Sequence, residues 1–501
     1  MTGLWWGAAG RPLVHNVQLM SNELKDRAIE VLLGDDLADV VDMVLLKRDG
    51  ELEAHARGGV VGFTADGVRW VRGPDPLARQ DPSAFAPLET ELGSLRPAND
   101  KNHYPYAHSS VAQLFDDPRA PDLAVVHTPA HNWEERGGHR GEHGSLDLVQ
   151  SRAPLIFSGA GVRAKGRVAA HARMVDVAPT LAALAGVRPN GDGRLLARQD
   201  GSVIKEVLDP RERPRALVAF LWDGTNANVL YAMADAGELP NVARLMEAGI
   251  TFGHGLIASF PSVTLANHTS AITGLHPGHH GILHNAYFDR ASGRQIITNA
   301  PQTWHLARNE LREDAETVFE AIARGGRGFT AAINEPTDRG AGYSTFDLFR
   351  RGEVPALEGA LPDASSLPGA TQEFVNLKRE YAWSSSADAM AVLQAQQLWA
   401  GANGNPRPTL MWVNLILPDA ANHAGGPYSD IGHAGLRDTD RRMGEILDAL
   451  DWGGGTTAFA LLADHGMEES DPGCKGDFDE ALTRAGIPFR DEGYGFVYLT
   501  P

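Results

Sequence analysis

The sequence predicts an α/β fold in which a mostly parallel sheet is covered by helices on both faces. Apolar runs at 215–223, 408–419 and 456–464 have the length of buried strands, and helical patterns such as 435–450 lie between them. This alternation is typical of parallel strands joined by crossover helices. Each of the three runs also ends in an aspartate. Ligands of open α/β sheets gather at the carboxyl ends of the strands, so we expect the functional site there.

Composition restricts the class of protein. The 501 residues are 43% hydrophobic and 22% charged, as in an ordinary globular protein. The net charge of −19 disfavours binding to a nucleic-acid polymer or an anionic membrane. Cys474 is the single cysteine, which excludes an intrachain disulfide and a multi-cysteine zinc site. Residues 1–16 lack a signal-like apolar region, and no stretch approaches the roughly 18 apolar residues of a membrane span. We therefore expect a cytoplasmic protein without a membrane segment, and the oligomeric state stays open.

The segment 1–200 mixes helix and strand signals. Residues 21–34 have helical spacing behind a serine cap, and residues 41–73 are typical of a meander of short strands separated by Asp-Gly turns. Further buried strands and a helix are expected at 123–128, 153–161 and 175–187. The polar, proline-bearing segment 201–214 is predicted to be a linker.

Acidic and imidazole side chains follow the strands of the second part of the chain. Asp223 ends one apolar run, Asp419 ends another with His423 four residues later, and Asp464 is followed directly by His465. An aspartate after a strand is ordinarily a helix cap or a turn former. Several such groups at matching strand ends are not explained by caps, so we expect them to meet in one place.

This set of side chains is suited to divalent metals. Carboxylates and imidazoles without thiolates favour Zn²⁺, with Mn²⁺ or iron as second choices. Three aspartates and at least two histidines exceed the ligand set of a single zinc ion, which predicts two metal ions. A pair of cations clamps the oxygens of a phosphoryl transfer.

Thr264 is the candidate nucleophile. It opens a helical pattern, TLANHTSAITG, and a hydroxyl held beside a metal loses its proton at neutral pH. The start of a helix also favours a phosphate oxygen, and Asn267 on the same turn is expected to donate its amide to another. The alternative is that Thr264 only caps the helix.

Four motifs resemble the alkaline phosphatase superfamily, above all its type I phosphodiesterase and nucleotide pyrophosphatase branch, with phosphonoacetate hydrolase nearby. They are Asp223 after a strand, TLANHTSAITGLHPGHHGI from Thr264, PDAANHAGGP around Asp419, and ADHGM around Asp464. The resemblance implies an alkaline phosphatase-like core with a small sheet and a cap insert at about 285–405. It also implies a first metal held by Asp223, Thr264, Asp464 and His465, and a second held by Asp419, His423 and a further histidine.

The further histidine is not found after His465, because residues 466–501 contain none. Residues 137–162, however, resemble the end of a family member, so the chain looks circularly permuted. In this interpretation residues 1–200 are equivalent to the usual C-terminal part, residues 215–501 to the usual N-terminal part, and together they form one catalytic domain. His143 then completes the second metal site, and His139 is its competitor. The alternative is an independent N-terminal domain with a histidine-rich surface loop.

The resulting prediction is a metal-dependent hydrolase that cleaves phosphodiester or pyrophosphate bonds through a phospho-threonine intermediate at Thr264. Its substrate is expected to be a small phosphate- or phosphonate-containing molecule. A C–P bond hydrolase or a phosphomonoesterase on the same residues is the enzymatic alternative. A metal-binding protein without turnover is the non-enzymatic alternative.

Overall fold

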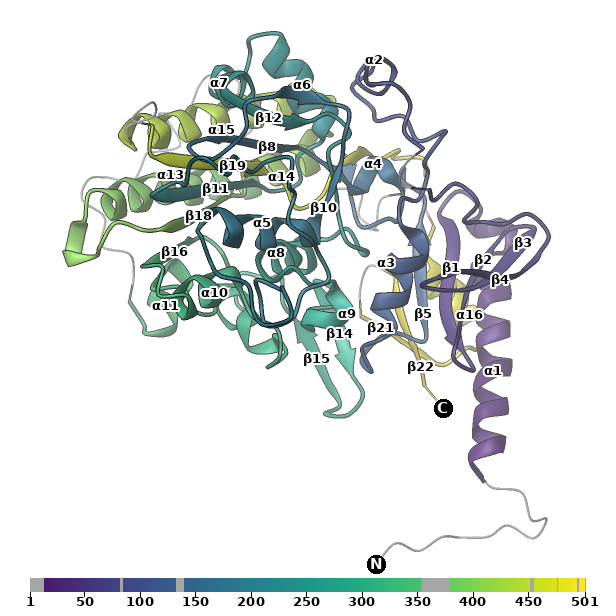
Figure 1. Cartoon of the computed structure of the whole chain (residues 1–501). Coiled ribbons are helices and arrows are strands. Elements are labelled where there is room, and N and C mark those ends of the chain that lie inside the picture. Colours follow the sequence, from purple (N-terminus) through teal and green to yellow (C-terminus); the bar gives the residue numbers. More distant parts are fainter. Residues whose placement is uncertain are drawn as a thin grey trace, which may run out of the picture.

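The structure is a computed structural model. The residues that it describes are 13–81, 84–131, 139–353, 379–450, 455–474, 476–492 and 495–500. The predicted mixed α/β class is confirmed, because the largest sheet is mostly parallel and carries helices on both faces (Figure 1). Residues 1–12 and 501, the two ends of the chain, lie outside the described residues.

The main sheet has eight strands. Their order is β17 (Tyr343–Ser344), β16 (Thr330–Ile333), β18 (Leu410–Leu415), β11 (Ala216–Trp222), β19 (Thr457–Leu462), β8 (Leu155–Gly159), β12 (Gly249–Phe252) and β9 (Gly166–Val168). Among these described strands, β8 alone runs against its two neighbours, and every other adjacent pair is parallel. Every residue of β11, β18 and β19 is buried. This explains why these strands are continuous apolar runs rather than alternating patterns.

Helices cover each face of the main sheet through a separate apolar cluster. One face carries α5 (Val177–Leu184), α8 (Thr264–Thr273) and α10 (Val318–Arg324). The opposite face carries α6 (Ala227–Asp235), α7 (Pro240–Ala248), α13 (Arg379–Trp399) and α15 (Asp430–Ala449). The helix α15 begins behind Ser429, whose hydroxyl accepts from the Gly432 amide. These layers fix the strand ends on which the site is built.

The predicted meander is confirmed as part of a second, antiparallel sheet of seven strands. Their order is β21 (Phe489–Asp491), β22 (Phe496–Leu499), β5 (Leu123–His127), β1 (Val41–Arg48), β2 (Glu51–Ala56), β3 (Gly59–Thr64) and β4 (Gly67–Arg72). The turn between β1 and β2 places Asp49 at φ 50° and Gly50 at φ 90°. Tight hairpin turns need such left-handed residues.

The two parts of the chain are interleaved in both sheets. Strands β8 and β9, from the segment 1–200, lie in the main sheet, whereas β21 and β22, from the end of the chain, lie in the second sheet. The helices α1 (Leu13–Leu32) and α16 (Phe478–Arg484) pack together on one face of the second sheet, at the right of Figure 1. The segment 1–200 therefore shares its cores with the rest of the described chain.

Two predicted boundaries differ from the structure. The segment 285–405 contains α10 and β16, which belong to the core, so an insert does not run through it without interruption. Outside the main sheet and its two helical layers lie a hairpin of β14 (Ala286–Asp289) and β15 (Arg294–Ile297), the 3₁₀ helix η3 (Trp304–Glu310) and α11 (Thr345–Arg350). Residues 354–378 lie outside the described part of the chain. The predicted linker 201–214 packs onto the core through buried Ile204 and Val207.

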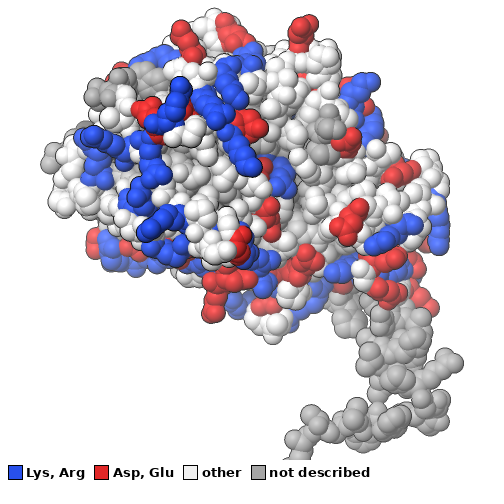
Figure 2. All heavy atoms as spheres, viewed as in Figure 1, with Lys and Arg blue, Asp and Glu red and all other residues white. Residues whose placement is uncertain are grey.

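Charges of both signs are mixed on the surface. Figure 2 shows acidic and basic side chains intermingled over the visible face. No helix among the described residues combines the length and the apolar character that crossing a membrane requires. That the protein avoids nucleic-acid polymers stays a prediction from its net charge.

Candidate metal centre

The main sheet brings the predicted aspartates together. Strand β11 pairs in parallel with both β18 and β19, so the carboxyl ends of the three strands are adjacent. Asp223 follows β11, Asp464 follows β19, and Asp419 lies on the first turn of α14 (Leu417–Gly425), just beyond β18. Gly224 directly follows Asp223 and has φ 62°. A Cβ on this residue would lie only 2.5 Å from Asp419 Oδ1, so glycine is needed for the close approach of the two segments.

The first group of candidate ligands is deeply buried. Asp223, Asp464 and His465 offer ligand atoms that lie within 4.8 Å of one another. His465 Nε2 is 3.1 Å from Asp464 Oδ2 and 3.7 Å from Asp223 Oδ1. The hydroxyl oxygen of Thr264 lies 3.5 Å from the same His465 nitrogen. The side chains predicted for the first metal are thus within reach of a single ion.

The second group is more open and adjoins the first. His423 Nε2 lies 3.4 Å from Asp419 Oδ1, and His143 Nε2 lies 3.9 Å from that oxygen. The ring of His143 stacks on that of His465 with the centroids 3.7 Å apart. His143 and Asp419 therefore meet here although they lie in opposite parts of the sequence.

The three imidazoles share one orientation. Their Nδ1 atoms donate to backbone carbonyl oxygens: His143 to Ser262 at 3.0 Å, His423 to Gly141 at 2.7 Å, and His465 to Gly466 at 2.8 Å. Metal-binding histidines commonly make such a bond, because it fixes the tautomer and leaves the other nitrogen free to bind. The Nε2 lone pairs consequently face the aspartates.

The electrostatics of the groups also fit cations. Asp223 Oδ1, Asp419 Oδ1 and Asp464 Oδ2 are buried and have no hydrogen-bond partner among the described residues. Burial, and then the charges of Asp464 and Asp419, raise the pKa of Asp223 well above its ordinary value. Burial, and then neighbouring His465 and His423, lower the pKa of His143 well below its ordinary value. Imidazole nitrogens beside crowded carboxylates are a donor set that divalent cations stabilise.

Thr264 is not the cap of its helix. The helix α8 begins at Thr264 itself, and the capping position is occupied by Val263, whose side chain makes no capping hydrogen bond. Thr264 is only 7% exposed, and its hydroxyl oxygen faces His465. The predicted start of a helix at Thr264 is confirmed, and the alternative of a simple cap is not supported.

A profile of the family described as type I phosphodiesterase / nucleotide pyrophosphatase matches residues 217–501, more than half of the chain. The chain belongs to this family. The resemblance seen in the four motifs is confirmed, and the family consists of metal-dependent enzymes.

Curated relatives match about half of the chain. Ectonucleotide pyrophosphatase/phosphodiesterase family member 1 of Mus musculus is 26% identical over 260 residues, which cover 52% of this chain and 24% of the relative. Venom phosphodiesterase of Macrovipera lebetinus is 25% identical over 255 residues, which cover 50% of this chain and 26% of the relative. The chain thus spans about a quarter of the length of these curated relatives. Among solved structures, inactive murine ectonucleotide pyrophosphatase/phosphodiesterase 5 in complex with AMP has a TM-score of 0.34 at 18% identity, covering 50% of this chain and 57% of that chain.

Asn267 has a different place from the one the sequence suggested. Its side-chain nitrogen donates to the carbonyl oxygens of Ser259, Pro261 and Val263, and its side-chain oxygen accepts from the Ser259 amide. The residue is fully buried. The side-chain amide of Asn267 therefore makes its hydrogen bonds to the loop before α8, and the structure does not support its predicted contact with phosphate.

A different asparagine lies beside the candidate nucleophile. Asn285 Oδ1 accepts from the Leu265 amide at 3.2 Å, which places the side chain at the first turn of α8. The residue is 9% exposed, and within the described part of the chain its Nδ2 makes no hydrogen bond. Asn285 therefore has an amide available for a ligand next to Thr264. Sequence reasoning missed it, because it follows the helix at no regular helical or strand spacing from Thr264.

The two asparagines form a matched pair for mutation. We expect Asn285→Ala to lower kcat for a diester by about 100-fold, as the loss of a donor to a reacting oxygen does, and to lower the free energy of unfolding by only about 1 kcal/mol, because the Leu265 amide alone loses its acceptor. We expect Asn267→Ala to lower the free energy of unfolding by about 3 kcal/mol, because it leaves buried backbone groups without partners. Thermal melts and steady-state kinetics on both variants check this. The assignment of a ligand-binding role to Asn285 and a structural role to Asn267 would be contradicted if both variants lost kcat equally and Asn267→Ala kept its stability.

His268 and Glu335 form a buried pair that the sequence did not reveal. His268 Nδ1 lies 2.9 Å from Glu335 Oε2, and its Nε2 faces Asp223 at 3.7 Å and Asp464 at 3.6 Å. Burial opposes charge on this ring, but Glu335 and Asp223 raise the pKa of His268 well above its ordinary value. His268 Nε2 makes no hydrogen bond in the described part of the chain, so the ring faces the two aspartates from the side of α8 through its charge rather than through a bond. Glu335 follows β16, inside the segment that was expected to be an insert.

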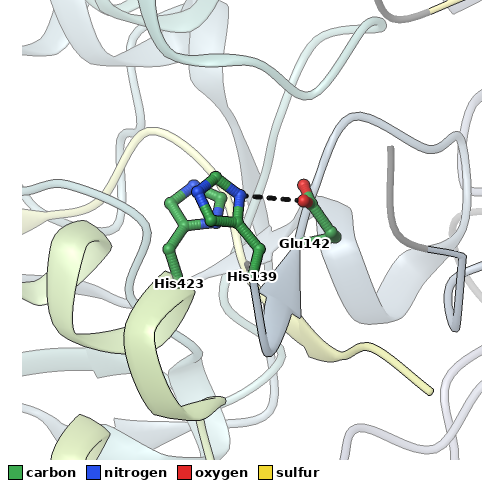
Figure 3. A group of neighbouring side chains, drawn as sticks. All are labelled: His139, Glu142 and His423. Atoms are coloured by element: carbon green, nitrogen blue, oxygen red, sulfur yellow. Dashed lines mark hydrogen bonds and ion pairs between the residues drawn. The ribbon is translucent and has the colours of Figure 1, made fainter. Parts of the chain in front are cut away.

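His139 belongs to a third cluster, which touches the second metal group. His139 Nδ1 lies 3.0 Å from Glu142, and its ring lies against His423 with the centroids 4.2 Å apart (Figure 3). His139, Glu142 and His423 also offer ligand atoms within 4.8 Å of one another. Because His423 faces Asp419 with Nε2, His139 packs behind the histidine that is predicted to bind, whereas His143 faces Asp419 directly.

Proposed function

We propose that this protein is a metal-dependent phosphodiesterase or pyrophosphatase in which Thr264 is the nucleophile. The observation that carries the proposal is the position of the Thr264 hydroxyl. Thr264 starts a ten-residue helix and does not cap it. Its hydroxyl oxygen lies 3.5 Å from His465 Nε2, beside the buried carboxylates. A second group of ligands adjoins it through the stacked rings of His143 and His465.

The residues divide into two sets of metal ligands in this proposal. Asp223, Thr264, Asp464 and His465 would hold one ion, and Asp419, His423 and His143 would hold the other. Zn²⁺ suits this mixture of nitrogen and oxygen ligands without thiolates, and Mn²⁺ or iron are second choices. Bound there, the two ions would neutralise phosphate oxygens and lower the pKa of the threonine hydroxyl.

The side chains of the site have separate roles in the reaction. Thr264 Oγ1 attacks phosphorus, the bond from phosphorus to the leaving oxygen breaks, and the phosphoryl group stays on Thr264 until water hydrolyses it. The amino end of α8 favours the charge of the phosphoryl group, and Asn285 Nδ2 donates to one of its oxygens. The buried His268–Glu335 pair places a ring nitrogen 3.7 Å from Asp223 and 3.6 Å from Asp464, on the side of these carboxylates that faces α8.

We also propose that the chain is a permuted form of the family fold, with residues 1–200 in the role of the usual C-terminal part. The family match begins at residue 217 and so leaves His143 outside it. Nevertheless His143 offers a ligand atom within 4.8 Å of those of Asp419 and His465, and β8 lies within the main sheet. The metal content of His143 variants tests this interpretation.

The alternatives differ in what they need from the site. A phosphomonoesterase needs cationic groups for two terminal phosphate oxygens, and no lysine or arginine lines the described pocket beside Thr264. A metal-binding protein without turnover needs no hydroxyl at the start of α8. A C–P bond hydrolase would use the same residues, so only its substrate distinguishes it.

A substrate panel tests the proposed function. We expect the zinc-loaded protein to cleave bis(p-nitrophenyl) phosphate, to be slower on p-nitrophenyl phosphate, and to leave phosphonoacetate intact. Release of p-nitrophenol and of inorganic phosphate measures the three reactions, and the chelator-treated protein is the control. Turnover of phosphonoacetate without turnover of the diester would instead assign the C–P hydrolase alternative.

A further inference from the structure

The helix α14 carries two of the three side chains proposed to hold the second metal ion. Asp419 lies on its first turn and His423, four residues later, on its last turn. Residues at this spacing lie on the same side of a helix, and His423 Nε2 is 3.4 Å from Asp419 Oδ1. The place of the second ion therefore depends on where α14 begins.

The amino end of α14 has no side-chain cap of its own. Its capping position is Ile416, whose side chain cannot accept a hydrogen bond, and Pro418 has no amide hydrogen. The amides of Ile416 and Leu417 instead donate to Asp388 of α13, one to each carboxylate oxygen, at 2.8 Å and 3.1 Å. A side chain from a different helix thus takes the place of the missing cap.

Asp388 belongs to a buried polar group between α13 and α15. It is fully buried, as is Arg442 of α15, which donates to Ser385 Oγ at 2.9 Å and to Asp438 Oδ2 at 3.1 Å. Burial raises the pKa of Asp388 to about 7, whereas the charge of Arg442 and the two accepted amides act in the opposite direction. At pH 8 the carboxyl is consequently ionised, and both of its oxygens accept an amide.

The first ligand group is held in a different way. Asp223 follows β11 and Asp464 follows β19, and these two strands pair directly in the main sheet. The group of Asp223, Asp464 and His465 contains no residue of α14. A shift of the start of α14 should therefore affect the second ion and spare the first.

We propose that Asp388 is a positioning residue for the second metal ion, because its two hydrogen bonds fix the start of α14 and thereby the places of Asp419 and His423. The inference rests on the second set of ligands in the proposed function and not on the chemistry of Thr264. Outer groups that orient metal ligands typically contribute about 10-fold to 100-fold to metal affinity.

The chain offers a control carboxylate that makes the same bonds at a helix without predicted ligands. Asp440 of α15 is also buried, and it accepts from the Val242 amide at 2.8 Å and from the Asn241 amide at 3.2 Å, again with one oxygen each. These amides lie at the start of α7, which carries none of the predicted metal ligands. Loss of either carboxylate should lower stability, but only the loss of Asp388 should change metal binding.

The variants Asp388→Asn and Asp440→Asn test the inference at pH 8. Asparagine keeps the size of the side chain but has one acceptor oxygen instead of two, so we expect both variants to melt at comparably lower temperatures. Zinc titration of the metal-free proteins by calorimetry, with elemental analysis at saturation, measures the two affinities. Asp388→Asn should bind the second ion about 30-fold more weakly and the first ion as the wild type does, whereas Asp440→Asn should keep both affinities.

The other outcomes separate the inference from the proposed function. Wild-type affinity for both ions in Asp388→Asn, or equal weakening in the two variants, would overturn the positioning role and leave the two-metal site intact. A wild-type protein that binds a single ion would instead reject the second set of ligands, and the inference would fall with it.

Hydrogen exchange of the wild-type protein keeps the inference testable if Asp388→Asn does not fold. Coupling between two places is reciprocal, so zinc must protect the start of α14 if that start sets the metal affinity. Mass spectrometry should find exchange in the peptide with Ile416 and Leu417 about 10-fold slower with two equivalents of zinc than with one. The peptide with Asn241 and Val242 should not change. Equal protection of both peptides, or none at α14, would contradict the inference.

Discussion

Replacement of Thr264 with alanine is expected to reduce the turnover of a phosphodiester by a factor on the order of 10⁴ or more. Loss of a nucleophile removes the covalent route altogether, which is why such variants lose several orders of magnitude in kcat. The fold should survive, because the Thr264 side chain does not cap α8 and its hydroxyl faces His465 at 3.5 Å rather than a backbone group. Steady-state kinetics and a thermal melt measure the two effects.

The same helix provides the control. Thr273 is also a buried threonine, but it ends α8, about 13 Å from Thr264 at 1.5 Å per residue, and donates to the Thr269 carbonyl oxygen. Thr273→Ala should keep its kcat, and Thr264→Ser should keep a measurable rate because it retains a hydroxyl. Mass spectrometry of the acid-quenched wild-type enzyme should find the phosphoryl group with its retained ester on the peptide of Thr264. Wild-type rates in Thr264→Ala would exclude the nucleophile.

The strand ends could be predicted from sequence because the signal that marks them lies within a few neighbouring residues. A short apolar run that ends in an aspartate marks both a buried strand and its carboxyl end, and β11 and β19 follow this rule. The sheet then brings Asp223 and Asp464 together through parallel pairing. The meander of β1 to β4 was equally accessible, since Asp-Gly turns are short-range signals, whereas its pairing with β5 and the joining of β21 and β22 were not predicted.

Side-chain direction within a turn could not be predicted in the same way. Asn267 stands three residues after Thr264, which places it on the same side of α8, but the loop from Ser259 to Val263 folds back over it and uses its amide. Asn285 takes the position beside Thr264 through a hydrogen bond to the Leu265 amide. Such contacts depend on loop paths that a pattern of helix and strand does not contain.

A pocket beside Thr264, lined by the aromatic side chains of Trp304, Phe346, Phe349 and Trp383, was also beyond sequence reasoning. Its rings come from η3, α11 and α13, and the sequence of this region showed only aromatic and polar residues without a motif. Their convergence follows from tertiary packing, because α13 lies against β16 and β18 while α11 lies against η3. The core role of β16 was itself missed, because its four residues form a weak signal in a region interpreted as an insert.

Replacement of His143 with alanine is expected to remove one metal ion of about two per chain and to lower kcat by about 100-fold or more. His143 faces Asp419 with its Nε2 and donates from Nδ1 to the Ser262 carbonyl oxygen. Removal of this imidazole leaves the second set with Asp419 and His423 alone, which is too few ligands to retain an ion at low concentration. Elemental analysis after dialysis measures the metal content independently of activity.

His139→Ala is the matched control, because His139 lies four residues earlier and contacts the same His423, but from behind. It should retain both ions, with at most a modest loss of affinity through the weaker support of the His423 ring. If His143→Ala kept both ions while His139→Ala lost one, the third cluster of His139, Glu142 and His423 would be the metal site instead. If neither variant lost metal, residues 1–200 would not complete the site and the permuted interpretation would be wrong. A loss confined to His143→Ala means that the first part of the chain supplies a ligand which the family match from residue 217 onward does not contain.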